Sequence, residues 1–204
     1  MTAQWPATWP VTWGENCTVE LPLVTDSEGF AIYALDLMGR NRLNGLAAGF
    51  LLDGLRAAGI AESFDLVLTA ESKAIALAQE LTNRLGNKDY VVLRKSRKLY
   101  MKNPMAVGVQ SITTKAPQTF WLGEDQADLL KGRRVCVVDD VVSTGGTLAA
   151  IFNMAEKVGF EISAIAAVLT EAEKRTAFRD VPIVSLAHIP LPATTPYIPT
   201  QDGI

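Results

Sequence analysis

The stretch VVDDVVSTGGTL, residues 137–148, places two adjacent carboxylates at the end of an apolar run and follows them with a turn of small residues. The apolar run begins at Val135, and the residues after Gly146 have the spacing of a helix. In a parallel α/β sheet, ligands bind where the strands end. The stretch therefore predicts a strand, a ligand-binding turn and a helix, in that order.

The turn STGGT, residues 143–147, predicts an anion site. Small residues let backbone N–H groups close around an anion, and a helix N-terminus adds favourable partial charge. The turn has neither the lysine of a Walker loop nor the glycine spacing of a Rossmann fingerprint. Asp139 and Asp140 would repel phosphate but accept hydrogen bonds from hydroxyls. A ribose 5-phosphate would suit both parts of the motif, with its phosphate at the turn and its hydroxyls at the aspartates. The alternative is a helix N-cap beside two solvated aspartates, and the length of the motif argues against it.

Apolar strands alternate with helices along the chain, which predicts a parallel α/β sheet. The predicted strands are residues 18–24, 30–38, 64–69, 89–95, 106–113, 117–123, 133–140 and 161–169, and the predicted helices are residues 41–58, 72–86, 124–130 and 146–159. The strands at 106–113 and 117–123 would form an antiparallel hairpin. This hairpin is either a flap over the site or an extension of the sheet edge.

The composition is that of one globular domain with a core: 204 residues, 49% of them hydrophobic and 20% charged. The formal net charge of −3 argues against broad attraction to nucleic acid. Two cysteines, Cys17 and Cys136, are too few for a disulfide framework and favour a reducing compartment. The N-terminus lacks the pattern of a signal peptide, and no apolar run reaches the ~18 residues of a membrane span. We expect a cytoplasmic protein without nucleic-acid or membrane partners.

The stretch RVCVVDDVVSTGGT, residues 134–147, resembles the phosphoribosyl-pyrophosphate (PRPP) motif of the type I phosphoribosyltransferases. TAESKAIALAQEL, residues 69–81, resembles the pyrophosphate loop of that family, and VVLRKSRKLYM, residues 91–101, resembles the stretch before the flexible loop of its adenine enzymes. The resemblance implies a Rossmann-like parallel sheet flanked by helices, with an antiparallel flap and a small hood. In a single domain of residues 1–204, residues 1–40 would supply the N-terminal arm, a hairpin of the strands 18–24 and 30–38, and a possible hood, and residues 64–170 the PRPP-binding core.

The resemblance also assigns roles to residues. Asp139 and Asp140 would hold the ribose hydroxyls and, with Lys95, form the catalytic set. The residues implied to bind the 5-phosphate are Ser143, Thr144, Gly145, Gly146 and Thr147. Those implied to bind pyrophosphate are Glu71, Ser72, Lys73, Ala74, Arg94, Lys95, Lys98 and Lys102. The alternative for the basic run at residues 94–102 is a solvated face or a nucleic-acid patch, and Lys102 and Lys115 are candidates to close a lid.

By this resemblance the protein transfers the 5-phosphoribosyl group of PRPP to a purine-like base and releases pyrophosphate and a nucleoside monophosphate. Mg²⁺ would be held largely by PRPP, so no dense cluster of protein ligands is needed. A homodimer is expected, as in many members of the family. Ser143 stands where the oxopurine enzymes usually have an aspartate, which favours adenine or xanthine. The alternative is a PRPP-sensing regulator without turnover, although residues 1–60 show no helix-turn-helix.

Several features outside these motifs have two interpretations. Residues 1–16 hold three Trp and two Pro without periodicity and predict an irregular arm, which would cap the core or contact another subunit. Glu171 would lie near the base or be a surface acid at a helix start. Phe30 and Tyr33 would stack on the base or belong to the core. His188, in an apolar C-terminal strand, is interpreted as structural rather than as a general base.

Overall fold

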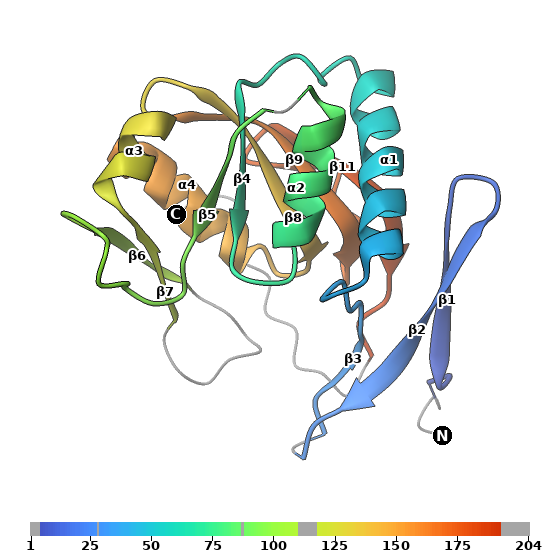
Figure 1. The fold of residues 1–204 in the computed structure, drawn as a ribbon. Helices are drawn as coiled ribbons and strands as arrows, with labels where there is room; N and C mark the ends of the chain where they lie inside the picture. Colours follow the sequence, from blue (N-terminus) through green and yellow to red (C-terminus); the bar gives the residue numbers. More distant parts are fainter. Residues whose placement is uncertain (1–4, 28, 87, 110–117, 193–204) are drawn as a thin grey trace.

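The computed structural model describes residues 5–27, 29–86, 88–109 and 118–192. Its centre is a six-stranded sheet in the order β10-β11-β9-β8-β4-β5 (Figure 1). Every neighbouring pair is parallel except β10 with β11. This arrangement confirms the predicted α/β fold. The strands are β4 (Leu66–Ala70), β5 (Tyr90–Leu93), β8 (Arg134–Val142), β9 (Glu161–Glu171), β10 (Ala177–Phe178) and β11 (Val181–Ile189).

The strand order reverses between β4 and β8. From β4 the chain goes outward to β5, then returns to the other side of β4 with β8 and continues through β9 to β11. In such sheets ligands bind at the carboxyl ends of the strands beside the reversal. Residues 71–74 follow β4 and residues 143–145 follow β8. The topology therefore brings two predicted binding loops together, although they lie far apart in the sequence.

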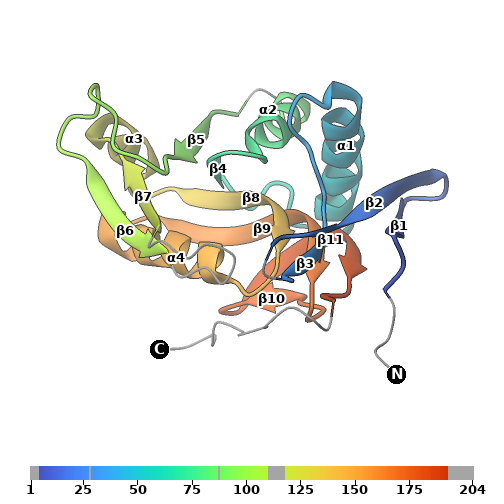
Figure 2. The same cartoon turned by 90° about the horizontal axis from the view of Figure 1, so that it is seen from below.

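Helices cover both faces of the sheet (Figure 2). Along β8, Val135 and Val137 belong to the core packed against α4, whereas Cys136 and Val138 belong to the core packed against α1 and α2. This central strand is apolar on both faces, which explains its unbroken hydrophobic run. None of the described helices is long and apolar enough to cross a membrane. The helices are α1 (Asn41–Ala57), α2 (Ile75–Arg84), α3 (Glu124–Leu130) and α4 (Gly146–Val158).

The N-terminal segment is a strand, so the predicted irregular arm is wrong. β1 (Thr8–Trp13) pairs antiparallel with β2 (Cys17–Thr25). Its apolar side chains alternate with exposed ones, and Val11 and Trp13 are buried, as expected for an edge strand with one face on the core. The rings of Trp5 and Trp9 pack against Tyr33. This contact supports the interpretation of the arm as a cap on the core of its own chain.

The strand predicted over residues 30–38 is much shorter in the structure. Only β3 (Ala31–Tyr33) pairs with β2, which completes a three-stranded antiparallel sheet. Residues 34–40 leave the sheet and lead into α1. The alternation of apolar and polar residues continues through Leu35 and Leu37, but their side chains are buried without a partner strand. Periodicity alone does not report which backbone groups find a partner.

The hairpin predicted at residues 106–123 is present as β6 (Met105–Val109) and β7 (Gln118–Leu122), paired antiparallel. The backbones of Arg94 and Trp121 exchange hydrogen bonds of 2.9 and 2.8 Å, which join β7 to the end of β5. The base of the hairpin thus extends the sheet edge. The predicted flap residues 110–117, Lys115 among them, lie outside the described residues.

Candidate active site

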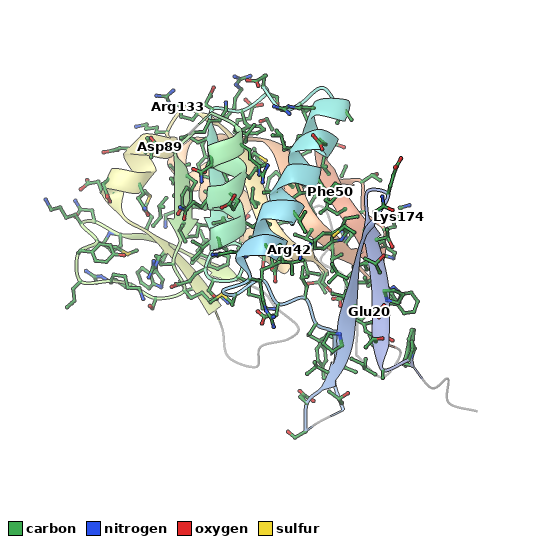
Figure 3. The ribbon with its side chains drawn as sticks, turned by 45° about the vertical axis from the view of Figure 1, so that its right-hand side comes forward. Glu20, Arg42, Phe50, Asp89, Arg133 and Lys174 are labelled. Atoms are coloured by element: carbon green, nitrogen blue, oxygen red, sulfur yellow. The ribbon has the colours of Figure 1, made fainter. Side chains whose placement is uncertain are left out.

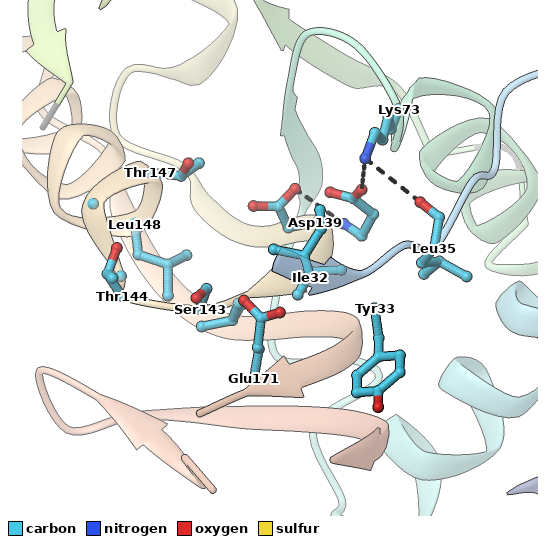
Figure 4. A pocket seen from close by; sticks show the side chains of 15 residues that line it. Ile32, Tyr33, Leu35, Lys73, Asp139, Ser143, Thr144, Thr147, Leu148 and Glu171 are labelled. Atoms are coloured by element: carbon cyan, nitrogen blue, oxygen red, sulfur yellow. Dashed lines mark hydrogen bonds and ion pairs between the residues drawn. The ribbon is translucent and has the colours of Figure 1, made fainter. Parts of the chain in front are cut away.

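A cavity of about 260 Å³ lies at the carboxyl end of the sheet, where β4, β8 and β9 end (Figure 4). Residues of β3, and Leu35 just after it, form another side of this cavity. Both predicted aspartates and the whole predicted turn line it. The lining residues are Ile32, Tyr33, Leu35, Lys73, Asp139, Asp140, Val141, Val142, Ser143, Thr144, Gly145, Gly146, Thr147, Leu148 and Glu171. The cavity therefore occupies the reversal of strand order, where this fold class binds ligands.

The turn between β8 and α4 has the backbone of an anion cradle. Gly145 adopts a left-handed conformation with φ of 89°, and a Cβ built on it would lie 2.6 Å from Cε2 of Phe178. Only glycine fits this position without strain or collision. No side chain caps the N-terminus of α4, so its first N–H groups are available to a ligand. The turn thus combines free backbone donors with the positive end of a helix dipole.

The two aspartates at the end of β8 interact with each other. The backbone N–H of Asp140 donates a hydrogen bond to Oδ1 of Asp139 at 2.9 Å. Burial, and then the charge of Asp140, raise the pKa of Asp139 well above its ordinary value, while the charge of Lys95 opposes the rise. Two like charges are thus held side by side in a partly buried position. A ligand that donates hydroxyl groups or carries positive charge would relieve this repulsion.

Lys73 connects three segments around the cavity. Its Nζ lies 3.5 Å from Oδ2 of Asp140 and donates a 3.5 Å hydrogen bond to the carbonyl of Leu35 (Figure 4). The loop after β4, the end of β8 and the segment after β3 therefore meet at one ammonium group. Because this side chain is 48% exposed, its charge remains accessible to an anion. Among the residues predicted to bind pyrophosphate, Lys73 is the one that lines the cavity.

Glu71 holds other residues of the site in place. Its Oε1 lies 3.2 Å from Nη2 of Arg94, and its Oε2 accepts a 2.8 Å hydrogen bond from the backbone N–H of Lys95. The carboxylate of Glu71 would repel pyrophosphate. Its contacts instead connect the loop after β4 to the residues after β5. Nε of Arg94 is buried without a hydrogen-bond partner among the described residues. Glu71 therefore fixes the side chain of Arg94 and the backbone of Lys95 next to the loop that carries Lys73.

The remaining residues predicted to bind pyrophosphate lie away from the cavity. Nζ of Lys98 hydrogen-bonds Oγ of Ser96 at 2.6 Å. Lys102 lines a separate hollow with Tyr100 and acidic residues of α3. Ser72 and Ala74 occupy the turn that leads into α2, and Ala74 is buried. The basic run is thus split: Arg94 pairs with Glu71, the charge of Lys95 acts on Asp139, and Lys98 and Lys102 have other partners.

Glu171 is the residue of this site that the sequence left most open. It is the last residue of β9, it is 6% exposed, and it lines the cavity. The interpretation as a surface acid is therefore wrong. Burial raises the pKa of Glu171, and a hydrogen bond from the Ser143 side chain opposes the rise. The sequence contained one indication of this role: Glu171 follows a predicted central strand, and the carboxyl end of that strand lies at the same edge of the sheet as Asp139.

The apolar wall of the cavity comes from Ile32, Tyr33 and Leu35. The Tyr33 ring is 2% exposed, and its hydroxyl donates a 3.1 Å hydrogen bond to the carbonyl of Pro6. Tyr33 is thus a core residue that also forms a wall of the site, whereas Phe30 does not line the cavity. Local sequence gives no signal for Ile32 and Leu35, because their approach to β8 depends on the packing of the whole N-terminal segment.

Two other features lie apart from this group. His188 pairs through Nδ1 with Oγ1 of Thr170 at 3.1 Å, between neighbouring strands of the sheet, which supports its interpretation as structural. A second hollow, of about 760 Å³, lies between β2 and the start of α1. Figure 3 shows Glu20 and Arg42, which line it from these two elements. Leu35 is common to both cavities.

Comparison with known proteins agrees with this geometry. Residues 40–200 match the family described as the phosphoribosyl transferase domain. An adenine phosphoribosyltransferase of Acidobacterium capsulatum is 33% identical over 140 residues, which cover 68% of this chain and 74% of the relative. A hypoxanthine/guanine phosphoribosyltransferase of Methanotorris igneus is 37% identical over 112 residues, which cover 55% of this chain and 57% of the relative.

The fold is also that of a solved structure. The crystal structure of an adenine phosphoribosyltransferase from Thermoanaerobacter pseudethanolicus superposes with a TM-score of 0.67 at 22% identity. The superposition covers 82% of this chain and 95% of that one. At this identity the likeness concerns the fold.

Proposed function

The chain belongs to the type I phosphoribosyltransferase family, and from this premise we propose that it transfers the 5-phosphoribosyl group of PRPP to a purine base, with adenine preferred. One observation carries the proposal. An anion-binding turn, two adjacent carboxylates and the half-exposed ammonium group of Lys73 converge on one cavity at the reversal of strand order. These are the groups that a ligand with a phosphate, vicinal hydroxyls and a pyrophosphate requires.

Each part of PRPP has a complement around the cavity. The 5-phosphate accepts hydrogen bonds from the turn at residues 143–147 and from the first N–H groups of α4. The ribose hydroxyls donate to Asp139 and Asp140. The pyrophosphate lies toward Lys73, with the charges of Arg94 and Lys95 held nearby by Glu71. Lys98 and Lys102 do not line the cavity, and their predicted contact with pyrophosphate stays a prediction.

The residues present suit Mg²⁺ in the form expected for this substrate. The described part of the chain contains no cluster of three or more His, Cys, Asp or Glu side chains that could hold a metal. The paired carboxylates of Asp139 and Asp140 are what a Mg²⁺ ion uses when it takes most of its ligands from water and substrate. When bound, Mg²⁺ would neutralise the charge that develops on the leaving pyrophosphate.

To catalyse this reaction, the protein must position the two substrates and stabilise the charges that develop in the transition state. The bond between C1 of the ribose and pyrophosphate breaks, and the electron pair leaves with pyrophosphate. A ring nitrogen of the base bonds to C1, and its proton passes to the departing pyrophosphate. Positive charge develops on the ribose in the transition state. The carboxylates of Asp139 and Asp140 stabilise that charge, and Lys73 stabilises the leaving group. The apolar wall of Ile32 and Leu35 limits the access of water.

The choice of adenine as the preferred acceptor rests on the turn. The relatives include enzymes named for adenine and others named for hypoxanthine and guanine. The family resemblance places an aspartate before Thr-Gly in the oxopurine enzymes, and this chain has Ser143 there. A neutral hydroxyl next to Glu171 leaves a single carboxylate on that side of the cavity.

The test is release of pyrophosphate from PRPP and Mg²⁺, measured with adenine, hypoxanthine, guanine, xanthine, uracil and orotate in separate reactions. We expect release with adenine above all other bases and loss of release in Asp140→Asn. Thermal unfolding with and without PRPP accompanies the assay. A chain that PRPP stabilises without release for any base would be a PRPP sensor and would overturn the proposed transfer.

A further inference from the structure

Glu171 is a buried carboxylate that the proposed chemistry at C1 does not use. It ends β9, whereas the aspartates end β8 and Lys73 follows β4. Since β8 lies between β9 and β4 in the sheet, Glu171 and Lys73 approach the cavity from opposite sides of the aspartates (Figure 4). If the pyrophosphate occupies the side of Lys73, the side of Glu171 is left for the acceptor base.

The surroundings of Glu171 leave it able to accept more hydrogen bonds. A buried carboxylate is costly unless donors surround it. The hydroxyl of Ser143 supplies one donor, whereas a carboxylate offers about four acceptor positions. The side chain is 6% exposed and lines the cavity. A ligand seated there would therefore meet an acceptor that water reaches poorly.

The neighbouring walls suit a flat, largely apolar ligand. Ile32, Tyr33 and Leu35 line the same cavity as Glu171 (Figure 4). A planar base can bury its faces against such side chains while its polar edge meets the carboxylate. An exocyclic amino group donates to a carboxylate, whereas a carbonyl oxygen at the same position is repelled.

We propose that Glu171 accepts a hydrogen bond from the exocyclic 6-amino group of the base and thereby selects 6-aminopurines over 6-oxopurines. The proposal rests on the proposed phosphoribosyl transfer and specifies the acceptor at that same site. A site with a buried acceptor rejects a ligand that leaves the acceptor unpaired. For one charge-assisted hydrogen bond we expect AMP to bind about 10–100-fold more tightly than IMP.

The test compares AMP and IMP binding to the full chain by calorimetry, because binding does not require turnover. Glu171→Met removes the acceptor, and AMP affinity should fall about 10–100-fold while IMP affinity changes little. In Glu171→Gln the amide can donate to an oxopurine, so AMP and IMP should bind about equally. Glu161→Gln is the matched control, because it makes the same change at the exposed opposite end of β9. It should retain the preference of the wild-type chain.

Two outcomes overturn the inference. One is a wild-type chain that does not prefer AMP to IMP. The other is an AMP preference that survives in both Glu171 variants. Failure of the proposed transfer is distinguishable from failure of this inference. A chain that releases no pyrophosphate can still prefer AMP to IMP, and it would lose this preference in the Glu171 variants if Glu171 binds the base. Cooperative thermal unfolding of both Glu171 variants without ligand shows that the chain has folded.

Discussion

At the end of β8, Asp139 lies beside Asp140 and accepts a hydrogen bond from its backbone N–H. Burial and the neighbouring charge raise the pKa of Asp139 above that of an exposed aspartate. The folded state thus binds this proton more tightly than the unfolded chain does. By linkage, the ionised carboxylate lowers stability at pH values above the folded-state pKa. Such an arrangement is typical of a residue retained for a ligand rather than for the fold.

Asp139→Asn should therefore raise the melting temperature at neutral pH. The asparagine Oδ1 can still accept the hydrogen bond from Asp140, and the buried charge is gone. The gain should fade as the pH falls through the folded-state pKa of Asp139 and should vanish below the unfolded-state value of about 3.9. Thermal melts between neutral pH and pH ~3.5 measure it, with Asp53→Asn, at an exposed position of α1, as the control. A lower melting temperature at neutral pH would contradict the prediction.

The turn also depends on one glycine. Gly145→Ala would place a Cβ in a left-handed conformation and 2.6 Å from Cε2 of Phe178. We expect a loss of about 1–3 kcal/mol in the free energy of unfolding, together with weaker PRPP binding. Gly132→Ala is the matched control, because Gly132 has φ of 70° with no atom within 4 Å of the built Cβ. Denaturant unfolding should rank the loss larger at Gly145 than at Gly132, and equal losses would refute the role of Phe178.

At the scale of elements, α1 approaches β11 through a small residue. A Cβ on Gly54 would lie 2.7 Å from Cγ1 of Val184, whereas one on Gly49, in the same helix, would meet only the guanidinium of Arg84 at 3.8 Å. Both glycines weaken the helix through the entropy of the unfolded chain. Only Gly54 has a packing reason to be present. This helix covers one face of the sheet and stands away from the cavity.

The two positions should therefore respond oppositely to alanine. Gly49→Ala should raise the free energy of unfolding by up to about 1 kcal/mol, through helix propensity. Gly54→Ala should lower it by about 1–3 kcal/mol, because the helix must move from β11. Pyrophosphate release should be unchanged in both, since neither residue lines the cavity. Urea unfolding measures the free energy of unfolding of both variants. If both substitutions stabilised the protein, the predicted collision of the Cβ at position 54 with Val184 would be contradicted.

At the scale of the whole molecule, the cavity is assembled from segments that are distant in the chain. Ile32 and Leu35 come from the N-terminal region, Lys73 follows β4, the aspartates end β8, and Glu171 ends β9. A ligand that bridges them binds the folded state and not the unfolded chain. Its binding energy therefore adds to the stability of the fold.

PRPP with Mg²⁺ should raise the melting temperature. At a PRPP concentration of 100 times its Kd the stabilisation is about 2.7 kcal/mol, which corresponds to about 5–10 °C for a domain of this size. Lys73→Ala should reduce the shift, because it removes the ammonium group beside Asp140. Differential scanning fluorimetry measures the shift, with Lys131→Ala, at an exposed residue next to α3, as the control. An equal shift in both variants would exclude Lys73 from the binding site.

Much of the fold could be predicted because its signals are local. The helix predicted over residues 124–130 is α3, and the one predicted over residues 146–159 is α4 to within a residue. The strand predicted over residues 133–140 is β8, which continues two residues further. Contiguous apolar runs and glycine stops encode these elements. The strand β1 was missed because its Trp and Pro residues form a pattern only once β2 pairs with it.

The sequence by itself determined the strand, turn and helix that carry Asp139, Asp140 and the anion cradle, because these groups are neighbours in the chain. Tertiary structure alone decided which distant side chains join them. It brought Ile32, Leu35 and Glu171 to the cavity and directed Lys98 and Lys102 elsewhere. The physical reason is that strand order and the direction of each loop follow from packing on both faces of the sheet, and local spacing does not record them.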